Sequence, residues 1–305
     1  EPEQMKQLIQ GCSYVIHAAA LAGSWPTRSQ RYFDINVAGT RHVMEAALEA
    51  RAKRVVLISS SSAVGFTSSK IHPGHEETPW RGDMGLDYVK SKYEADQLVE
   101  SMVREQNLPA LMILPGFMIG PYDTGPSSGQ LLVKAWNSPF KFCTAGGKNF
   151  VYNQDVAVAV VNALEMGRIG ERYICGGHNL TFRALFRLIE ETIGLPQSNL
   201  ILPPWVSVGL AHVLSGVGKM IRTKPLLTPE MAHNANQKIF FSSAKAQAEL
   251  KLPQTDIRQA LREAYLWFDQ NGYLKSYENT PQALPRHSHN WLQPGHRQDY
   301  SSLLS

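Results

Sequence analysis

The chain has 305 residues, 43% of them hydrophobic and 18% charged, and a formal net charge of +4 at pH 7. This length can bury one large hydrophobic core or two smaller ones, because domains usually contain ~100 to 200 residues. Lysine and arginine are mixed with acidic residues, which argues against a nucleic-acid-binding stripe and favours a small-molecule substrate. Cys12, Cys143 and Cys175 show no CxxC spacing, so we expect a reducing cytoplasm and no metal site.

Apolar runs and helical patterns alternate over the first part of the chain. The runs at 14–20, 55–59, 111–114 and 172–175 predict strands, and the patterns at 2–11, 36–51, 88–105 and 155–166 predict helices. This alternation is typical of an α/β fold with a Rossmann-like, doubly wound parallel sheet that carries helices on both faces. Ligands bind outside the carboxyl ends of such strands, so the segments after Ala20, Ser59 and Leu114 should converge on one cleft.

Helical patterns dominate from residue 178 onward, at 182–193, 205–221, 229–233, 243–250 and 257–271. They predict a smaller, mostly helical lobe that binds the substrate. We therefore divide the chain into a dinucleotide-binding domain at 1–121 and 151–177, a substrate lobe at 122–150 and 178–275, and a polar, flexible tail at 276–305.

The longest apolar stretch is 205–221, and its apolar residues lie around more than one face of the predicted helix. We expect it to be buried against the lobe, because exposing so much apolar area to water is costly. Peripheral contact with a membrane or an oily substrate is the alternative, with Lys219, Arg222 and Lys224 as the cations that could meet lipid phosphates. No signal peptide or membrane-spanning helix is predicted, so we expect a cytoplasmic protein without membrane insertion; the sequence also allows a homodimer.

A tyrosine and a lysine, Tyr88 and Lys92, stand four residues apart in a predicted helix, which places both side chains on one face. An ammonium beside a phenol favours the phenolate and lowers the tyrosine pKa, which suits acid–base work near neutral pH. Four serines at 59–62 follow a predicted strand and supply hydroxyls at its carboxyl end. Together these groups predict a proton-handling site, against the alternatives of a solvated surface pair and a serine-rich turn.

The order of these and further motifs resembles the extended short-chain dehydrogenase/reductase family, the NAD-dependent epimerase/dehydratase superfamily, over residues 2–274. The segments that match are 17–20 (HAAA), 36–40 (NVAGT), 59–65 (SSSSAVG), 77–79 (ETP), 88–92 (YVKSK), 115–121 (PGFMIGP) and 153–157 (NQDVA). Segments 167–181 and 240–245 are most similar to the dihydroflavonol-4-reductase-like group, and especially to hopanoid-associated sugar epimerases.

The resemblance implies a role for each matching residue. Tyr88 would be the acid–base group, and Lys92 would lower its pKa and bond the nicotinamide ribose. Ser61, third after the last apolar residue of its strand, would hold the reacting oxygen, and Asn36 would brace Lys92 through water. The cofactor, NAD or NADP, would be held by Tyr88, Lys92 and the residues at the strand ends: Ala18, Ala19, Ala20, Ser59, Pro115, Gly116, Phe117 and Met118.

The resemblance also implies a glycine-rich GxxGxxG turn after the first strand and a charged residue after the second, which selects NAD or NADP. The 305 residues contain neither in the expected place. We therefore expect an N-terminally truncated sheet, a further segment upstream of Glu1, and weak cofactor binding by these residues alone. Leu114 also departs from the family pattern, since many members carry arginine there.

These features predict an NAD(P)-dependent oxidoreductase or epimerase that acts on a carbinol or carbonyl carbon of a sugar nucleotide or a related alcohol or ketone. Epimerase and reductase share the hydride and proton steps and differ in whether the hydride returns to the other face. A reductase of a polyphenol-like or steroid-like ketone is an alternative. A non-catalytic protein that senses the cofactor or binds a partner is the alternative from another class.

Overall fold

A parallel sheet organises the first part of the chain. In the computed structural model, which describes residues 2–125, 128–137, 142–194, 200–220, 223, 225 and 227–274, the sheet has the strand order β1-β2-β3-β7. Its strands are β1 (Tyr14–His17), β2 (Arg54–Ile58), β3 (Ala110–Pro115) and β7 (Arg172–Cys175), and every neighbouring pair is parallel. The four predicted strands are confirmed, as is the α/β class of the fold.

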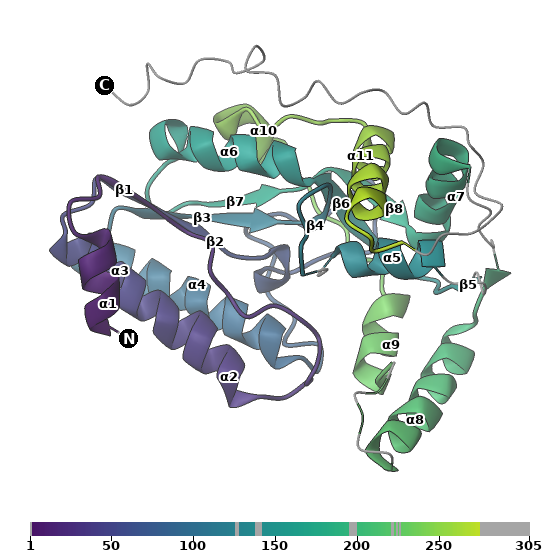
Figure 1. The fold of residues 1–305 in the computed structure, drawn as a ribbon. Coiled ribbons are helices and arrows are strands. Elements are labelled where there is room, and N and C mark those ends of the chain that lie inside the picture. Colours follow the sequence, from purple (N-terminus) through teal and green to yellow (C-terminus); the bar gives the residue numbers. More distant parts are fainter. Residues whose placement is uncertain are drawn as a thin grey trace. The chain divides into compact units, whose positions relative to one another are not determined.

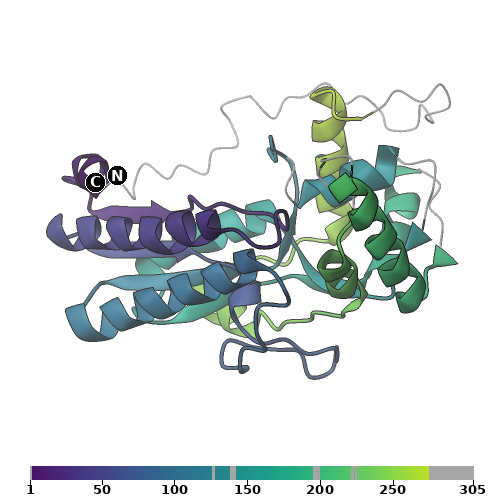
Figure 2. The ribbon, with the colours of Figure 1, turned by 90° about the horizontal axis from the view of Figure 1, so that it is seen from below.

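Helices cover both faces of this sheet (Figure 1). On one face lie α3 (Gly39–Glu49) and α4 (Asp87–Gln106), with α1 (Pro2–Ile9) packed against α3. Figure 2 shows α3 and α4 running side by side along the sheet. The other face carries α6 (Asn153–Met166) and α10 (Ala244–Leu250). The alternation of strands and helices in the sequence therefore predicted the layers correctly.

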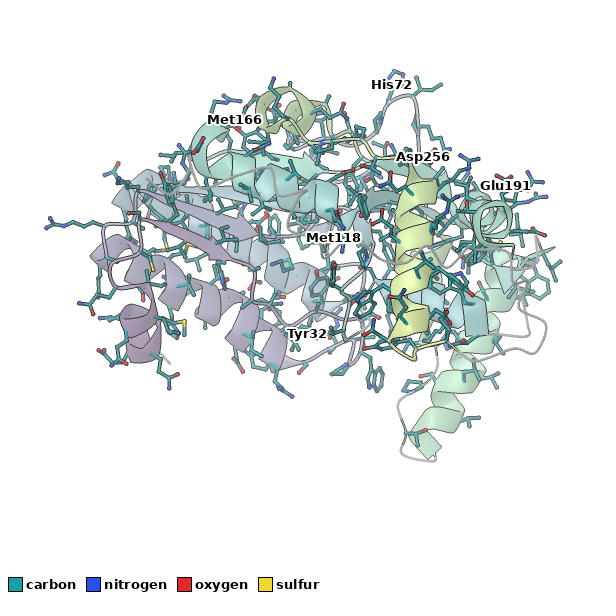
Figure 3. All side chains as sticks on the ribbon, turned by 45° about the horizontal axis from the view of Figure 1, so that its top comes forward. Tyr32, His72, Met118, Met166, Glu191 and Asp256 are labelled. Atoms are coloured by element: carbon teal, nitrogen blue, oxygen red, sulfur yellow. The ribbon has the colours of Figure 1, made fainter. Side chains whose placement is uncertain are left out.

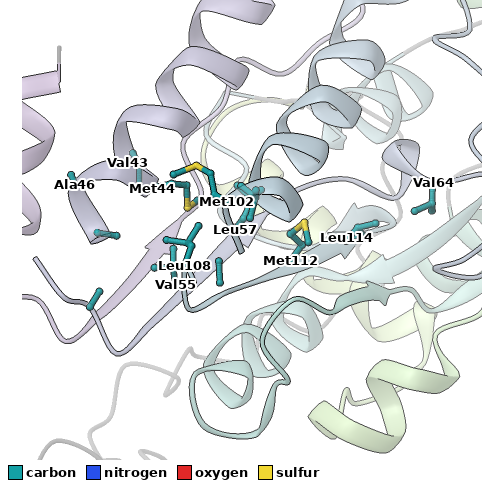
Figure 4. Packing of buried hydrophobic residues seen from close by; sticks show 14 of the residues in the cluster. Val43, Met44, Ala46, Val55, Leu57, Val64, Met102, Leu108, Met112 and Leu114 are labelled. Atoms are coloured by element: carbon teal, nitrogen blue, oxygen red, sulfur yellow. The ribbon is translucent and has the colours of Figure 1, made fainter. Parts of the chain in front are cut away.

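The two faces of the sheet carry separate hydrophobic clusters. Successive side chains of a strand point to opposite faces, so Leu57 and Met112 join the cluster under α3 and α4 (Figure 4). Their neighbours Val56 and Ile113 join the cluster under α6 and α10. All four side chains are buried, which explains why these strands read as continuous apolar runs rather than as alternating ones.

Short elements surround the carboxyl end of the sheet. They are α2 (Gln30–Phe33), the π-helix η1 (Asp34–Ala38) and the 3-10 helix η2 (Ser61–Ala63). The one predicted helix at 36–51 is thus divided between η1 and α3 in the structure.

Later parts of the chain contain both helices and small sheets. The helices are α5 (Gly129–Asn137), α7 (Phe182–Ile193), α8 (Pro204–Met220), α9 (Pro229–Asn236) and α11 (Ile257–Gln270). The strands β4 (Phe117–Ile119), β6 (Gly147–Tyr152) and β8 (His178–Thr181) form one sheet, and β5 (Phe142–Cys143) pairs with β9 (Leu200–Ile201). These sheets were not predicted, because β6 (GKNFVY) and β8 (HNLT) mix polar with apolar residues and β5 and β9 have two residues each.

The expectation that segment 205–221 is buried was wrong. Residues 205–220 lie in α8, which packs against α9 and leaves Trp205 78% exposed and Val213 63% exposed. The residues of α8 that pack inward are small, as at Ser207 and Ala211, so the large apolar side chains are left on the outer face. Within the described residues, no helix is both long enough and apolar enough to span a bilayer. The predicted tail at 276–305 lies outside the described residues.

Candidate active site

The carboxyl ends of β1, β2 and β3 lie at one edge of the sheet. The parallel register pairs His17 with Leu57, and Ile58 with Ile113. The residues that follow each strand must therefore emerge side by side. These are Ala18 after β1, Ser59 after β2 and Gly116 after β3, which is the convergence that the strand pattern predicted.

The helix α4 brings Tyr88 and Lys92 to this edge. Lys92 is 3% exposed, and its Nζ donates a hydrogen bond of 2.9 Å to the carbonyl of Ile58, the last residue of β2. One turn earlier on the same face, Tyr88 is half-buried and meets the ring of Tyr32 edge-on at 6.2 Å between centroids. The i, i+4 spacing has thus placed phenol and ammonium at the end of the same strand.

Among the four serines after β2, Ser60 is the one that meets Tyr88. Its hydroxyl is near enough to the phenol to act on the Tyr88 pKa, which it lowers. The same oxygen lies 2.9 Å from the Ser62 hydroxyl and accepts a hydrogen bond of 3.2 Å from the Ser62 backbone. Ser60 keeps an extended backbone as the N-cap of η2, whereas Ser61 is already the first residue of that helix. This turn separates the two hydroxyls, and the role predicted for Ser61 stays a prediction.

Burial is the largest influence on the pKa values of Tyr88 and Lys92. It raises the pKa of Tyr88, and the Ser60 hydroxyl acts in the opposite direction. Burial also lowers the pKa of Lys92, against the charge of Asp96. The spacing of Tyr88 and Lys92 in the sequence predicted that Lys92 lowers the Tyr88 pKa. In this structure the desolvation of the phenol outweighs any such effect, because a buried phenolate loses its hydration.

Asn36 forms hydrogen bonds to two segments of this site, and none of those seen in the described residues is to Lys92. Its side-chain oxygen accepts a hydrogen bond of 2.7 Å from the backbone of Leu21, in the loop after β1. Its Nδ2 donates to the Leu21 carbonyl at 3.0 Å and to the Ser91 hydroxyl at 2.9 Å. Asn36 therefore ties the loop after β1 to the residue beside Lys92, which agrees with a supporting role while leaving the predicted water bridge untested.

The residues expected to hold the cofactor occupy the strand ends. Ala18, Ala19 and Ala20 are exposed, so a ligand could approach the backbone closely there. Pro115 is buried at the end of β3, Gly116 is half-buried, and a Cβ on Gly116 would lie 2.7 Å from Asn149 Oδ1.

Phe117 and Met118 follow on β4 as half-buried apolar side chains. Figure 3 labels Met118 near the end of the main sheet, with Tyr32 toward the same end. Lys92 Nζ has three hydrogens and gives one of them to Ile58. These features fit a nicotinamide and its ribose, since they combine an apolar wall, small residues and a cation with spare donors.

Two buried titratable groups beside Lys92 were not predicted as part of the site. His17 is 8% exposed, its Nε2 lies 3.0 Å from Thr40 Oγ1, and burial followed by the Lys92 charge lowers its pKa to about 4. Asp96 is fully buried, with no hydrogen-bond partner of ordinary geometry for either carboxylate oxygen, and burial raises its pKa to about 7. The sequence carried a signal for Asp96, because Lys92 and Asp96 share the helical phase of the apolar residues Val89 and Val99.

Comparison with known proteins shows the family to which the chain belongs. The model of the NAD dependent epimerase/dehydratase family matches residues 1–176, which is more than half of the chain. The chain belongs to this family. The family resemblance drawn from the sequence is thereby confirmed, and with it the NAD-dependent enzyme class.

Members of the epimerase/dehydratase family with diverse names are similar to this chain. A putative dihydroflavonol 4-reductase of Synechocystis sp. is 28% identical over 279 residues, which cover 89% of this chain and 80% of the relative. Sterol demethylase protein B of Methylococcus capsulatus is 28% identical over 278 residues, covering 88% of this chain and 83% of the relative.

Solved structures agree with the family assignment. The crystal structure of gox2253 superposes with a TM-score of 0.77 at 32% identity and covers 90% of this chain and 84% of its own. PA4631, a nucleoside-diphosphate-sugar epimerase from Pseudomonas aeruginosa, gives a TM-score of 0.71 at 25% identity, with coverage of 90% and 82%. The Rossmann-like fold predicted from the sequence is therefore confirmed.

Proposed function

We propose that this protein transfers a hydride between NAD or NADP and a carbinol or carbonyl carbon of its substrate, with Tyr88 as the acid–base group. The observation that carries the proposal is the meeting of Tyr88, Ser60 and Lys92 at the carboxyl end of β2. A phenol, a hydroxyl and a buried ammonium within one site are the groups that removing or adding an alcohol proton requires.

Each side chain takes one part in the proton step. Ser60 donates a hydrogen bond to the substrate oxygen and holds it beside Tyr88. The Tyr88 phenolate accepts the alcohol proton during oxidation, and the phenol returns it during reduction. The charge of Lys92, one turn along α4, favours the phenolate and opposes the burial that raises the Tyr88 pKa. Asn36 positions Ser91, the residue next to Lys92, through a hydrogen bond.

The nicotinamide would lie against Met118 and Phe117, with its ribose near Lys92 and its backbone contacts at Ala18, Ala19, Ala20, Ser59, Pro115 and Gly116. When bound, it supplies the acceptor or donor of the hydride. Within the described residues, the buried Lys92 ammonium gives one of its three hydrogens to Ile58, and its other hydrogens suit the ribose hydroxyls, which can accept them. The choice between NAD and NADP is part of the experiment below.

Two substrate classes follow from the family. The first is a sugar nucleotide, as in the name of the Pseudomonas aeruginosa epimerase. The second is a polyphenol-like or steroid-like ketone. The names of the dihydroflavonol reductase, the sterol demethylase and a plant 3β-hydroxysteroid dehydrogenase/decarboxylase support this second class.

The test combines the whole protein, including any residues that precede Glu1, with the oxidised and the reduced forms of NAD and NADP in separate reactions and with a substrate panel from each class. A deuterium label on the reduced nicotinamide separates the two reactions. A reductase places the label in its product and consumes the cofactor, whereas an epimerase changes the sugar and leaves the cofactor unconsumed. A protein that binds the cofactor but turns over no alcohol or ketone in the panel would favour the non-catalytic alternative.

A further inference from the structure

One face of α8 exposes a row of apolar side chains. Trp205 is 78% exposed, Val213 63%, Val217 44% and Leu210 40%. Trp205, Val213 and Val217 are spaced by multiples of four, so they lie along one side of the helix. A Cβ added to Gly209 or to Gly216 would meet no atom within 4 Å, so no described residue covers the row at these points.

The opposite face of α8 anchors the helix to its neighbours. Ser207 is buried, and its hydroxyl accepts a hydrogen bond of 2.8 Å from Asn236 Nδ2 at the end of α9. Ala211 is fully buried, and a Cβ on Gly218 would lie 3.1 Å from the Cα of Pro225. Figure 1 shows α8 with α9 beside it, away from the four-stranded sheet. The helix is therefore held by its small residues and presents its large apolar residues outward.

Along the sequence, the charged residues within α8 and just after it are all cationic. No aspartate or glutamate occurs between Glu191 and Glu230, whereas Lys219, Arg222 and Lys224 follow one another at the end of α8 and just beyond it. The sequence therefore joins an apolar helix face to a cationic segment without acidic residues. Such a pair is complementary to a surface that is both apolar and anionic. An anionic phospholipid bilayer has this combination, because its phosphates overlie its acyl chains.

We propose that the outer face of α8 docks in the headgroup layer of an anionic bilayer, with Trp205 and Val213 entering the acyl boundary. At 17 residues, α8 is too short and too tightly anchored to cross the bilayer. A second copy of this chain is the alternative occupant, which lipid-free sedimentation velocity distinguishes from a bilayer. Docking is independent of the proposed chemistry at Tyr88.

Co-sedimentation tests the proposal with the whole protein. One set of vesicles contains phosphatidylcholine alone, and the other contains phosphatidylcholine and phosphatidylglycerol in equal parts. We expect pelleting with the anionic vesicles, less with the neutral ones, and less at high salt because surface charges are screened. The variant Trp205→Ser/Val213→Ser should lower the partition coefficient roughly tenfold or more, from the apolar area that it removes.

A matched control is Leu8→Ser on α1, where a side chain that is 70% exposed lies on another element. It should pellet like the wild type, and the circular dichroism of both variants should match that of the wild type. Changing Lys219, Arg222 and Lys224 together to glutamine should abolish the preference for anionic vesicles.

Equal pelleting of wild type and Trp205→Ser/Val213→Ser would overturn the proposal, as would the absence of pelleting with anionic vesicles. So would a dimer in lipid-free sedimentation velocity that the double variant converts to monomer, since the face would then belong to a second copy.

Discussion

Replacing Ser60 and Ser61 separately by alanine distinguishes two adjacent hydroxyls that the sequence cannot tell apart. We expect Ser60→Ala to lose most of the activity, because its hydroxyl is the one that interacts with Tyr88. Ser61 is the matched control. It is half-buried in the same turn, and its hydroxyl makes no hydrogen bond within the described part of the chain.

The size of the effect follows from what Ser60 contacts. Removing a donor that stabilises a developing oxyanion typically lowers kcat by ~10²- to 10³-fold, or about 3 to 4 kcal/mol. Ser60→Ala also loses the contact with the Ser62 hydroxyl and the cap of η2, which should cost about 1 kcal/mol of folding stability. Ser61→Ala should change kcat by less than about twofold, because a substitution without lost partners is usually near neutral.

The assay is steady-state oxidation or reduction of the best substrate from the panel, with the urea midpoint of each variant measured beside it. A Ser61→Ala variant that loses more kcat than Ser60→Ala would refute the assignment of Ser60. If Ser60→Ala lowers the urea midpoint but leaves kcat unchanged, the role of Ser60 is only that of the N-cap of η2.

Three further changes test the groups around Tyr88. Lys92→Met should lose both turnover and affinity for NAD(P)H in a fluorescence titration, because it removes the charge near the phenol and the donors to the ribose; unchanged affinity would contradict the second role. The pKa of His17 is about 4 in the folded protein, below its ordinary 6.5. As the pH falls, His17 is therefore protonated first in the unfolded chain, and the free energy of unfolding decreases. Relative to His17→Gln, the wild type should lose about 2 kcal/mol of unfolding free energy between about pH 7.5 and about pH 5. Asp96→Asn removes a negative charge that raises the pKa values of Tyr88 and Lys92, so both limbs of the pH–rate profile should move to lower pH by roughly one unit. If Asp96→Asn lowers the rate but leaves the pH–rate profile at the same pH, Asp96 has only a structural role.

The main sheet and its flanking helices could be predicted because the buried strands form continuous apolar runs and the helices between them carry a helical period. The runs at 55–59 and 111–114 became β2 and β3 with shifts of one residue at most. The pattern at 182–193 became α7, which Thr181 caps through a hydrogen bond of 3.2 Å to the Ala184 backbone. In these elements local propensity and tertiary packing agree.

Periodicity could not settle the finer features of the site. Position after a strand does not tell which of four serines faces a helix, since that depends on where the chain turns into η2. The expected pKa of Tyr88 assumed a phenol beside a charge and neglected burial, which comes from the tertiary fold. The exposure of α8 also escaped the sequence pattern, because Ser207 and Ala211 rather than the large side chains make its inner contacts.

The most direct test of the central claim is the comparison of wild type with Tyr88→Phe, measured as single-turnover hydride transfer with saturating substrate and cofactor. The change removes the hydroxyl that moves the proton and keeps the ring that packs against Tyr32. The proposed mechanism predicts that the rate falls by ~10²- to 10⁴-fold, while the affinity for NAD(P)H stays nearly unchanged. A Tyr88→Phe variant that retains more than about half of the wild-type rate would contradict it, because acid–base groups contribute far more than twofold.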